Sequence, residues 1–245
     1  MTLMAAASET LYEHIDEALR FFYHEGFIPR GYGTFITSKL KLQGQEVDEK
    51  SAKDLVGLAI LLHDVGKAHS LYQKAIERYE REGVWRSRIV HELYSVAVAQ
   101  RVLILNEEAK RLVMTAILLH HEYMRLPNSS MVDEPFKADI EELKRVIMEL
   151  SLRYGLSEHL KLSEIRMLSK HEVRSVVKSL VAQIKVDRRL YACAALILHP
   201  LIICDNISAH RHRRDRIPRI LEDVDVLKDE EKAYDILRGV FGNHG

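Results

Sequence analysis

Leu55 to Lys67 reads LVGLAILLHDVGK, and this stretch decides the fold. Its first eight residues are apolar nearly all round a helix, as is typical of a helix buried at the centre of a protein. The carboxyl end of that helix brings His63 and Asp64 side by side, before Gly66 ends or bends it. Because a buried carboxylate is costly unless it is paired or bound to a metal, the stretch predicts a central helix with a polar site at its end.

Most of the remaining chain also has helical periodicity, so we expect an all-α fold of about nine helices, with residues 1–245 forming a single domain. The expected helices are 8–23, 51–64, 71–81, 91–105, 107–123, 136–154, 171–185, 187–210 and 228–241. Ser8 is expected to cap the first of them. Residues 29–45 hold three glycines and partly alternate, which predicts a loop with short strands over 30–45. Pro200 should kink or divide helix 187–210.

Composition excludes several classes of protein. The chain has 245 residues, with 36 Lys and Arg against 36 Asp and Glu. Zero net charge excludes a protein that coats nucleic acid by charge alone. The two cysteines, Cys193 and Cys204, cannot form a disulfide framework or a four-cysteine zinc site.

The sequence also bears on compartment and source. Residues 1–8 do not have the pattern of a secretory signal, and the longest apolar run, 192–204, contains Pro200 and is too short to span a bilayer. We therefore expect a cytoplasmic protein without membrane contact. The scarcity of Asn (4) and Gln (5) beside abundant charged residues favours a thermophilic source.

Histidine is the unusual residue, with 13 in the chain. Five of them adjoin helical stretches, most of these apolar, together with two aspartates. The residues concerned are His14, His63, His91, His120 and His121, with Asp64 and Asp205. A lone histidine on an apolar stripe is more often a hydrogen-bonded core residue than a ligand. The combined order along the chain, however, predicts one metal centre.

The expected ligands are nitrogen and oxygen atoms without thiolate. Such a set suits Mn, Fe, Co, Ni or Mg, and Zn less exclusively. Two ions that share one carboxylate, about 3.5–4 Å apart, promote in-line displacement at phosphodiesters, in which one ion helps to generate hydroxide and both stabilise charge on the phosphate. The residues alone therefore predict a metal-dependent phosphohydrolase.

These residues resemble the HD superfamily of metal-dependent phosphohydrolases, and most of all the stand-alone HD nuclease of type I CRISPR interference. The resemblance covers residues 14–209. Its motifs are His14, His63-Asp64-x-Gly66-Lys67-Ala68, Tyr72-Gln73, His91-Glu92-x-x-Ser95, His120-His121 and Asp205-x-x-Ser208-Ala209. The first HD element is shared by much of the superfamily, whereas the aromatic-Gln, H-x-x-x-S and HH elements favour the CRISPR branch.

The resemblance implies an HD helical bundle and assigns roles to its residues. One divalent metal would be held by His14, His63, Asp64 and Asp205, and a second by Asp64, His91, His120 and His121. Lys67 would bind or neutralise the scissile phosphate beside the catalytic Asp64. Ser95, Ser208 and Gln73 would lie around the ligands.

The resemblance also implies an activity and partners. The activity is divalent-metal-dependent hydrolysis of single-stranded DNA, with RNA as a second polymer, by two-metal in-line attack of metal-bound hydroxide in antiviral defence. A separate CRISPR helicase subunit would unwind the target for an RNA-guided surveillance complex, because the chain has no G-x-x-x-x-G-K-[ST] loop.

Two alternative functions stay open. His120-His121-Glu122 begins like the motif of the cyclic-dinucleotide phosphodiesterases of the superfamily, although the chain then departs from it. The first alternative is therefore a phosphohydrolase of nucleotides or cyclic dinucleotides. The second is a non-enzymatic all-α interaction protein with a structural metal.

A basic run follows Asp205. It places five arginines within residues 211–219, and Arg211, Arg213, Arg214 and Arg216 are its candidates for contact with a nucleic-acid backbone. A solvated helix end balanced by the acidic residues after it explains the run equally well. Trp85, in the segment before His91, is a candidate for stacking on bases, or a packed anchor.

Overall fold

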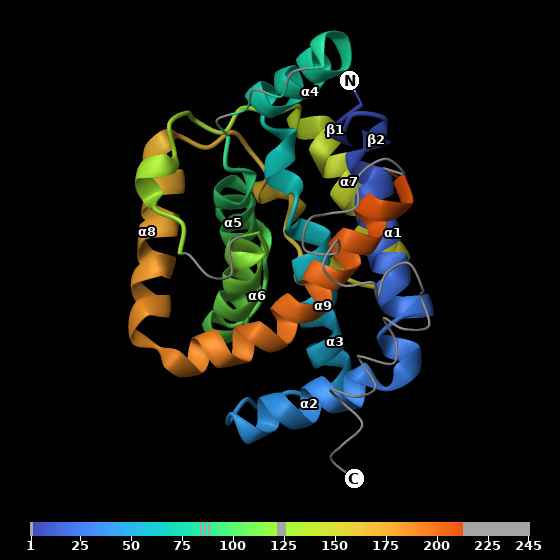
Figure 1. Ribbon diagram of the computed structural model, residues 1–245. Coiled ribbons are helices and arrows are strands. Elements are labelled where there is room, and N and C mark those ends of the chain that lie inside the picture. Colours follow the sequence, from blue (N-terminus) through green and yellow to red (C-terminus); the bar gives the residue numbers. More distant parts are fainter. Residues whose placement is uncertain (1, 84, 86, 88, 122–125, 213–245) are drawn as a thin grey trace. The chain divides into compact units, whose positions relative to one another are not determined.

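Nine α-helices and one short β-hairpin account for most of the chain that the structure, a computed structural model, describes: residues 2–83, 85, 87, 89–121 and 126–212 (Figure 1). The strands are β1 (Met4–Ala6) and β2 (Glu9–Thr10), and the helices are α1 (Leu11–Arg20), α2 (Tyr32–Leu42), α3 (Glu49–Leu62), α4 (Ser70–Glu82), α5 (His91–Val102), α6 (Glu107–Leu119), α7 (Ile140–Arg153), α8 (Lys170–Val186) and α9 (Arg188–His212). A π-helical turn, Phe21–Glu25, extends α1, and 3-10 turns lie at Ile28–Arg30, Val65–Ala68, Ser129–Met131, Ser157–His159 and Leu162–Glu164. The expectation of an all-α fold is confirmed.

The chain divides into two compact units, Met1–Ser208 and Ala209–Gly245. Of the second unit the structure describes only residues 209–212, the last turn of α9. The expected single domain over residues 1–245 stays a prediction, and the expected helix over 228–241 lies outside the described residues.

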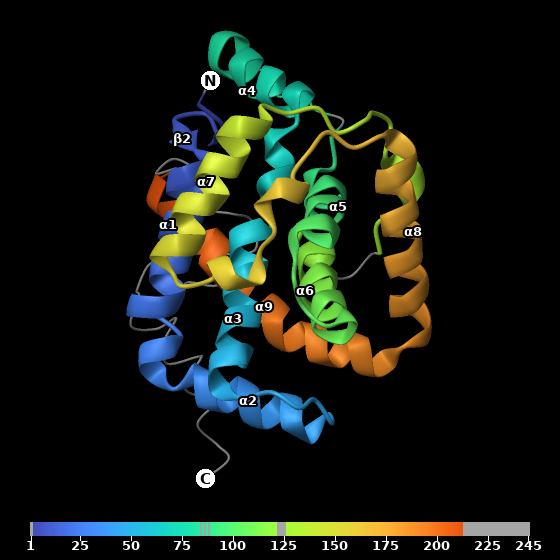
Figure 2. The same cartoon turned by 180° about the vertical axis from the view of Figure 1, so that it is seen from behind.

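Helix α3 lies at the centre of the first unit, where it contacts α1, α2, α5, α6 and α7 (Figures 1 and 2). Every residue from Asp54 to Leu62 is buried. Each large aliphatic side chain removed from water in this way contributes about 1.5–3 kcal/mol. The predicted central helix is therefore present, and it ends one residue before His63.

The amino-terminal hairpin changes the start of α1. Thr10, and not the expected Ser8, caps the helix: its side chain accepts from the backbone of Glu13, whose carboxylate accepts from the backbone of Thr10. This reciprocal arrangement is a capping box. Ser8 instead lies in the hairpin turn with a left-handed φ of 63°.

The expected loop with short strands over 30–45 is wrong, because α2 occupies Tyr32–Leu42. Its buried face includes Tyr32, Ile36 and Leu40, which are four residues apart and pack towards α3. Gly31 has a φ of 82° and ends the preceding 3-10 turn, so this glycine starts the helix. Contact with the central helix outweighs the weak helical propensity of the Gly and Thr residues in this segment.

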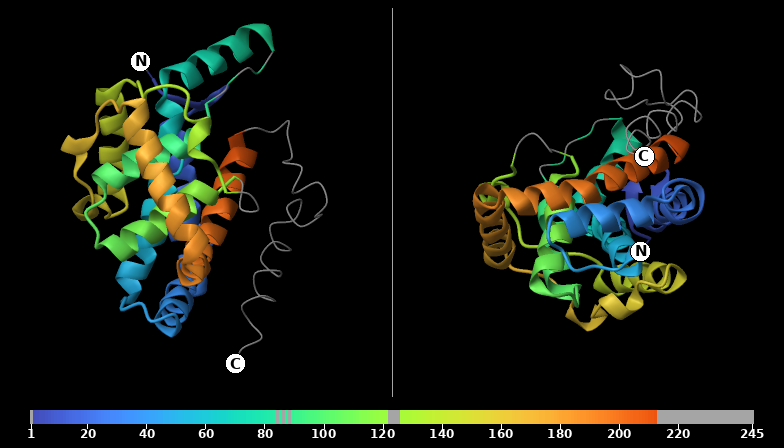
Figure 3. Two further views of the ribbon diagram at one scale, coloured as in Figure 1. Left: turned by 90° about the vertical axis from the view of Figure 1, so that its left-hand side faces the viewer. Right: turned by 90° about the horizontal axis from the view of Figure 1, so that it is seen from below.

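Helix α9 crosses the bundle from α8 towards α1 and bends along its length (Figures 1 and 3). It runs through Pro200 without a break, so the expected division at that residue does not occur. It is the one described helix long and apolar enough to cross a membrane by length and composition, a test that a buried core helix also passes. Because Ile197, Leu201 and Ser208 are buried in the fold, this is weak evidence for a membrane span.

Candidate metal centre

Five helices bring the seven predicted ligands together. His14 comes from the middle of α1, and Asp205 from the second half of α9. His63 and Asp64 follow α3, His91 opens α5, and His120 and His121 follow α6. Residues almost two hundred positions apart therefore meet at one point of the first unit.

The turn after α3 depends on Gly66. A Cβ atom on this residue would lie 2.0 Å from the carbonyl oxygen of His91, which is far inside van der Waals contact. The backbone N–H of Gly66 donates to Oγ of Ser95 at 2.8 Å. The glycine thus lets the turn pack directly on the first turn of α5, and that packing places Asp64 beside His91.

The two oxygens of Asp64 face different partners. Oδ1 lies 2.9 Å from Nε2 of His91 and 3.8 Å from Nε2 of His120. Oδ2 lies 3.1 Å from Nε2 of His14 and 3.4 Å from Nε2 of His63. Asp64 is fully buried, and each of its two oxygens faces a different pair of imidazoles.

We call these groups the buried half and the open half of the centre. The ligand atoms within each lie within 4.8 Å of one another. The buried half is His14, His63, Asp64 and Asp205, and the open half is Asp64, His91, His120 and His121, which is exposed. These are the two sets that the resemblance implies. Their arrangement is compatible with a role as metal ligands, which stays a prediction.

Hydrogen bonds from Nδ1 to backbone carbonyls orient two of the rings. Nδ1 of His63 lies 2.7 Å from the carbonyl oxygen of Ile60, and Nδ1 of His120 lies 2.6 Å from that of Ile117. A carbonyl only accepts, so Nδ1 carries a proton, and the neutral ring presents its lone pair at Nε2. This is the orientation in which a histidine ligates a metal.

The residues present fit a divalent cation. Nε2 of His14, His63 and His120 and Oδ1 of Asp64 are buried and make no hydrogen bond within the described part of the chain. Buried polar atoms are otherwise nearly always hydrogen-bonded. These four atoms lie close together, and in their deprotonated state they supply the electron pairs that a cation requires.

Electrostatics in the ion-free protein point the same way. Burial raises the pKa of Asp64, but the charges of His63, Lys67 and His91 outweigh it and hold the pKa well below its usual range. Burial lowers the pKa of His14, whereas the carboxylates of Asp205, Asp64 and Glu9 beside its ring raise it to about 10. Protons on the imidazoles therefore neutralise carboxylates in the buried half, and a bound cation would replace them.

Glu9, on β2, is the residue that sequence reasoning missed. It is fully buried, and its Oε1 lies 2.7 Å from Nδ1 of His14. Ser208 supports the same ring: its hydroxyl donates to the carbonyl oxygen of His14 at 2.8 Å and lies 3.1 Å from Nδ1. One acidic residue five positions before His14 forms no motif, so only the hairpin reveals Glu9.

The other predicted residues have mixed positions. Lys67 is buried and contacts Oδ2 of Asp64 at 2.5 Å. The amide of Gln73 forms hydrogen bonds with the backbone of Lys67 and of Met4, so it joins the hairpin to the turn after α3. Of the basic run, Arg211 lies in the last turn of α9, and Arg213, Arg214 and Arg216 lie outside the described residues.

A third group of metal-type side chains lies elsewhere. Asp54, Glu158 and His159 place their ligand atoms within 4.8 Å of one another. Lys50 lies among them and contacts both carboxylates. Because the ammonium group already balances the acids, this group is an ion-pair network between α3 and the 3-10 turn at residues 157–159.

Comparison with known proteins follows the same pattern. Residues 35–153 match the model of the HD domain. The chain is 24% identical over 247 residues to the CRISPR-associated endonuclease Cas3-HD of Methanocaldococcus jannaschii, covering 92% of this chain and 96% of the relative. It is 25% identical over 241 residues to the Cas3-HD endonuclease of Pyrococcus furiosus, covering 91% and 97%.

A solved structure shares the fold. The CRISPR-associated Cas3 HD domain protein of Methanocaldococcus jannaschii matches 82% of this chain and 99% of its own length, with a TM-score of 0.61 and 20% identity. Pyrococcus is a thermophilic source, in line with the composition. Together, the HD-domain match and the two Cas3-HD relatives support a metal-dependent HD nuclease of the CRISPR-associated type.

Proposed function

We propose that the chain hydrolyses phosphodiester bonds of single-stranded DNA, and of RNA as a second substrate, with two divalent ions that share Asp64. The observation that carries the proposal is the geometry of that carboxylate, with Oδ1 towards His91 and Oδ2 towards His14 and His63. A carboxylate with separate imidazoles at each oxygen is the arrangement that two neighbouring cations require.

The chain supplies the surroundings for this chemistry. Two bound ions would activate a water molecule and neutralise charge on the phosphate. The Lys67 ammonium, next to Asp64, is placed to attract the same phosphate. Ser95 holds the Gly66 turn through its hydrogen bond, and so keeps Asp64 at the first turn of α5.

Substrate and partners are part of the proposal. The curated relatives are named as CRISPR-associated endonucleases, which supports a role in antiviral defence in the cytoplasm. A separate helicase subunit would deliver a single strand, recruited by an RNA-guided surveillance complex. The arginines 211, 213, 214 and 216 are proposed contacts for the strand's backbone.

Hydrolysis by the full chain across Mn, Mg, Co, Ni and Fe tests the proposal. The substrates are single-stranded DNA, single-stranded RNA, mononucleotides and a cyclic dinucleotide. We expect degradation of the single strands, and a loss of roughly a thousandfold in Asp64→Asn, because an ion at a phosphate contributes several kcal/mol.

Asp54→Asn is the matched control. Asp54 is buried in α3, the helix that leads to Asp64, and pairs with His159 at 3.0 Å, outside the centre. This variant should keep the rate of the unmodified chain. Turnover of small nucleotides alone would instead indicate a nucleotide phosphohydrolase, and bound metal without hydrolysis of any substrate would indicate a structural metal.

A further inference from the structure

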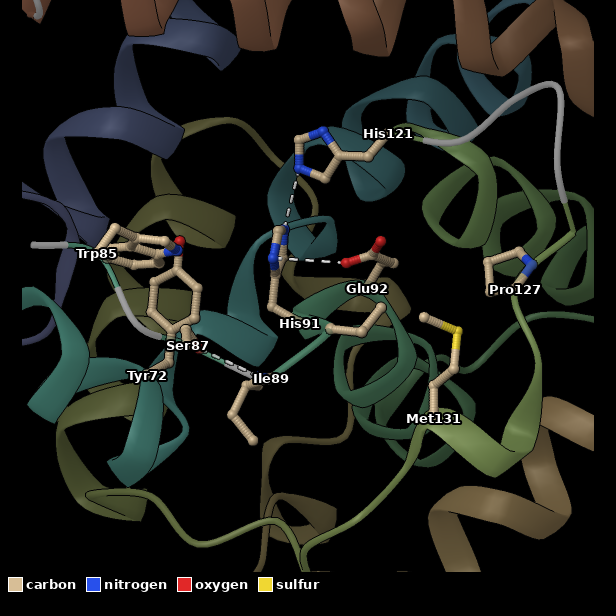
Figure 4. Close-up of a pocket in the computed structure, with 10 residues that line it drawn as sticks. Tyr72, Trp85, Ser87, Ile89, His91, Glu92, His121, Pro127 and Met131 are labelled. Carbon is tan, nitrogen blue, oxygen red and sulfur yellow. Dashed lines mark hydrogen bonds and ion pairs between the residues drawn. The ribbon is translucent and has the colours of Figure 1, made fainter.

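A pocket of about 290 Å³ opens beside the open half of the metal centre (Figure 4). His91 and His121, two proposed ligands of that half, are part of its lining. Binding pockets for drug-sized ligands begin at about 300 Å³, so this one suits a single small group. Whatever occupies it lies next to the atoms that would hold the second ion.

The walls of the pocket are mostly flat or apolar. Figure 4 shows Trp85 and Tyr72 on one side and Pro127 and Met131 on the opposite side, with His91 between them. The rings of Trp85 and Tyr72 meet edge to face, with centroids 5.3 Å apart. Trp85 is 47% exposed, so part of its indole surface remains open to a ligand.

Tyr72 connects Trp85 with the open half of the metal centre. It is almost fully buried, and its ring also meets that of His91 edge to face at 5.7 Å. Tyr79, further along α4, packs against Trp85 from 6.3 Å. The two tyrosines of α4 therefore hold the indole at a fixed distance from a proposed metal ligand.

Charge decides what the pocket can take. Among the described residues that line it, the formally charged side chain is the carboxylate of Glu92, and none is Lys or Arg. The negative charge of Glu92 repels a phosphate at this wall, whereas a neutral planar group is not repelled. A phosphate drawn to the metal centre leaves the attached nucleoside as the group that can reach the pocket.

We propose that this pocket binds one nucleobase of the single strand, stacked on Trp85, and so sets which phosphodiester lies at the metal centre. The proposal rests on the proposed nuclease function and extends it to a residue that no ligand motif includes. Stacking on an aromatic side chain is tolerant of sequence, because every base has a π-face. Trp85 is thus a positioning residue for a sequence-tolerant nuclease.

Cleavage mapping tests the proposal. The substrates are two end-labelled single strands of identical sequence, one of which lacks a single base at a defined position. With the unmodified chain, we expect cleavage at one linkage, at a fixed distance from the missing base, to fall roughly 5- to 150-fold, which corresponds to the energy of one stacked base. The other linkages should be cut as before.

Variants of Trp85 separate stacking from packing. Trp85→Leu keeps an apolar side chain without an aromatic face, and should cut the complete strand slowly, with no further loss on the strand that lacks a base. Trp85→Phe should restore most of the dependence on the base. Leu71→Ala, an exposed apolar residue of α4 that does not line the pocket, is the matched control. Equal losses on both strands in Trp85→Leu would overturn the proposal.

Fluorescence gives a readout without hydrolysis. Trp85 is the single tryptophan of the chain, so emission reports on this residue alone. A short single strand should quench the emission, and a strand without bases should not. Quenching without hydrolysis under any metal would keep the base pocket and reject the nuclease, whereas hydrolysis without a difference in quenching would reject the pocket.

Discussion

The buried and open halves of the metal centre share Asp64 but differ in everything around it. In the buried half, His14 and His63 are fully buried, and Glu9 and Ser208 support the ring of His14. In the open half, His121 is exposed and lies with its Nε2 3.2 Å from that of His91, at the edge of the pocket.

This difference indicates a division of labour between the two positions. Structural metal sites are closed by protein ligands, whereas catalytic sites keep a position open for water or substrate. By this criterion the buried half would hold its ion firmly. The open half would exchange its ion more readily and meet the strand, because the proposed base pocket adjoins only this half.

Replacing a ligand of the buried half should have the largest effect. His14→Ala removes one nitrogen and breaks the buried pair with Glu9, whose Oε1 lies 2.7 Å from Nδ1 of His14. Breaking a buried pair in this way costs about 3–5 kcal/mol of unfolding free energy. We expect a strongly lowered denaturation midpoint and the loss of one ion per chain by elemental analysis.

His69→Ala is the control for His14→Ala. His69 is also buried, but it packs on Tyr94 and Phe136 and its Nδ1 accepts from the backbone of Leu71. This variant should lose stability and keep its metal content. A His14→Ala protein that still holds two ions would show that His14 is wrongly assigned as a ligand of the buried half.

The pH dependence of metal affinity should separate the halves next. In the ion-free protein the pKa of His14 is raised to about 10 and that of His63 to about 9, the carboxylates of Asp64 and Asp205 outweighing burial. Protonated imidazole cannot ligate, so an ion entering the buried half must release these protons, and its affinity should rise with pH. Two released protons correspond to about a hundredfold per pH unit.

The open half should respond less. Burial lowers the pKa of His91, against the smaller opposing effect of Asp64, so this ring is already neutral near pH 7. Calorimetric titration at pH 6.5, 7.5 and 8.5 should therefore show one site that tightens steeply and one that changes little. Two sites whose metal affinities change equally with pH would contradict the proposed electrostatic difference between the halves.

Glu9→Gln should have a smaller effect, confined to the buried half. The neutral amide keeps the shape of Glu9 but weakens its hold on Nδ1 of His14, and partners of this kind change metal affinity about 10- to 100-fold. Competition with a fluorescent chelator measures the change. Glu13→Gln is the control, because Glu13 caps the same helix at the surface. Equal losses in both variants would trace the effect to the helix and not to His14.

The resemblance grouped the proposed ligands into the two sets that the structure brings together, but it did not reveal the difference between them. The proposed ligands adjoin helix ends or apolar faces, so periodicity and the resemblance together name them. Glu9 could not be found this way, because its contact with His14 depends on a two-stranded hairpin that turns at Ser8 with a positive φ. Local sequence patterns do not reveal which side chains come into contact when a turn reverses the chain.

The same limit explains the error over 30–45. Gly31 and Gly33 in that segment suggest a loop, and its buried face becomes visible only when α2 packs on α3. The fold class was predictable because most helices are strongly periodic, while this helix is defined by its tertiary contact. Pro200 predicted a kink or a division, and α9 continues through it to carry Asp205 to the buried half.

His121→Ala should have the smallest effect on the protein and the most selective effect on the centre. His121 is an exposed residue, so its replacement should change the free energy of unfolding by no more than about 0.5 kcal/mol, as is usual at the surface. It should weaken only the ion of the open half, by roughly tenfold, because Asp64, His91 and His120 remain. Cleavage at saturating metal should then recover most of its rate, whereas His14→Ala should not recover. If His121→Ala instead empties both halves, the ions bind cooperatively through Asp64, and the centre acts as one unit.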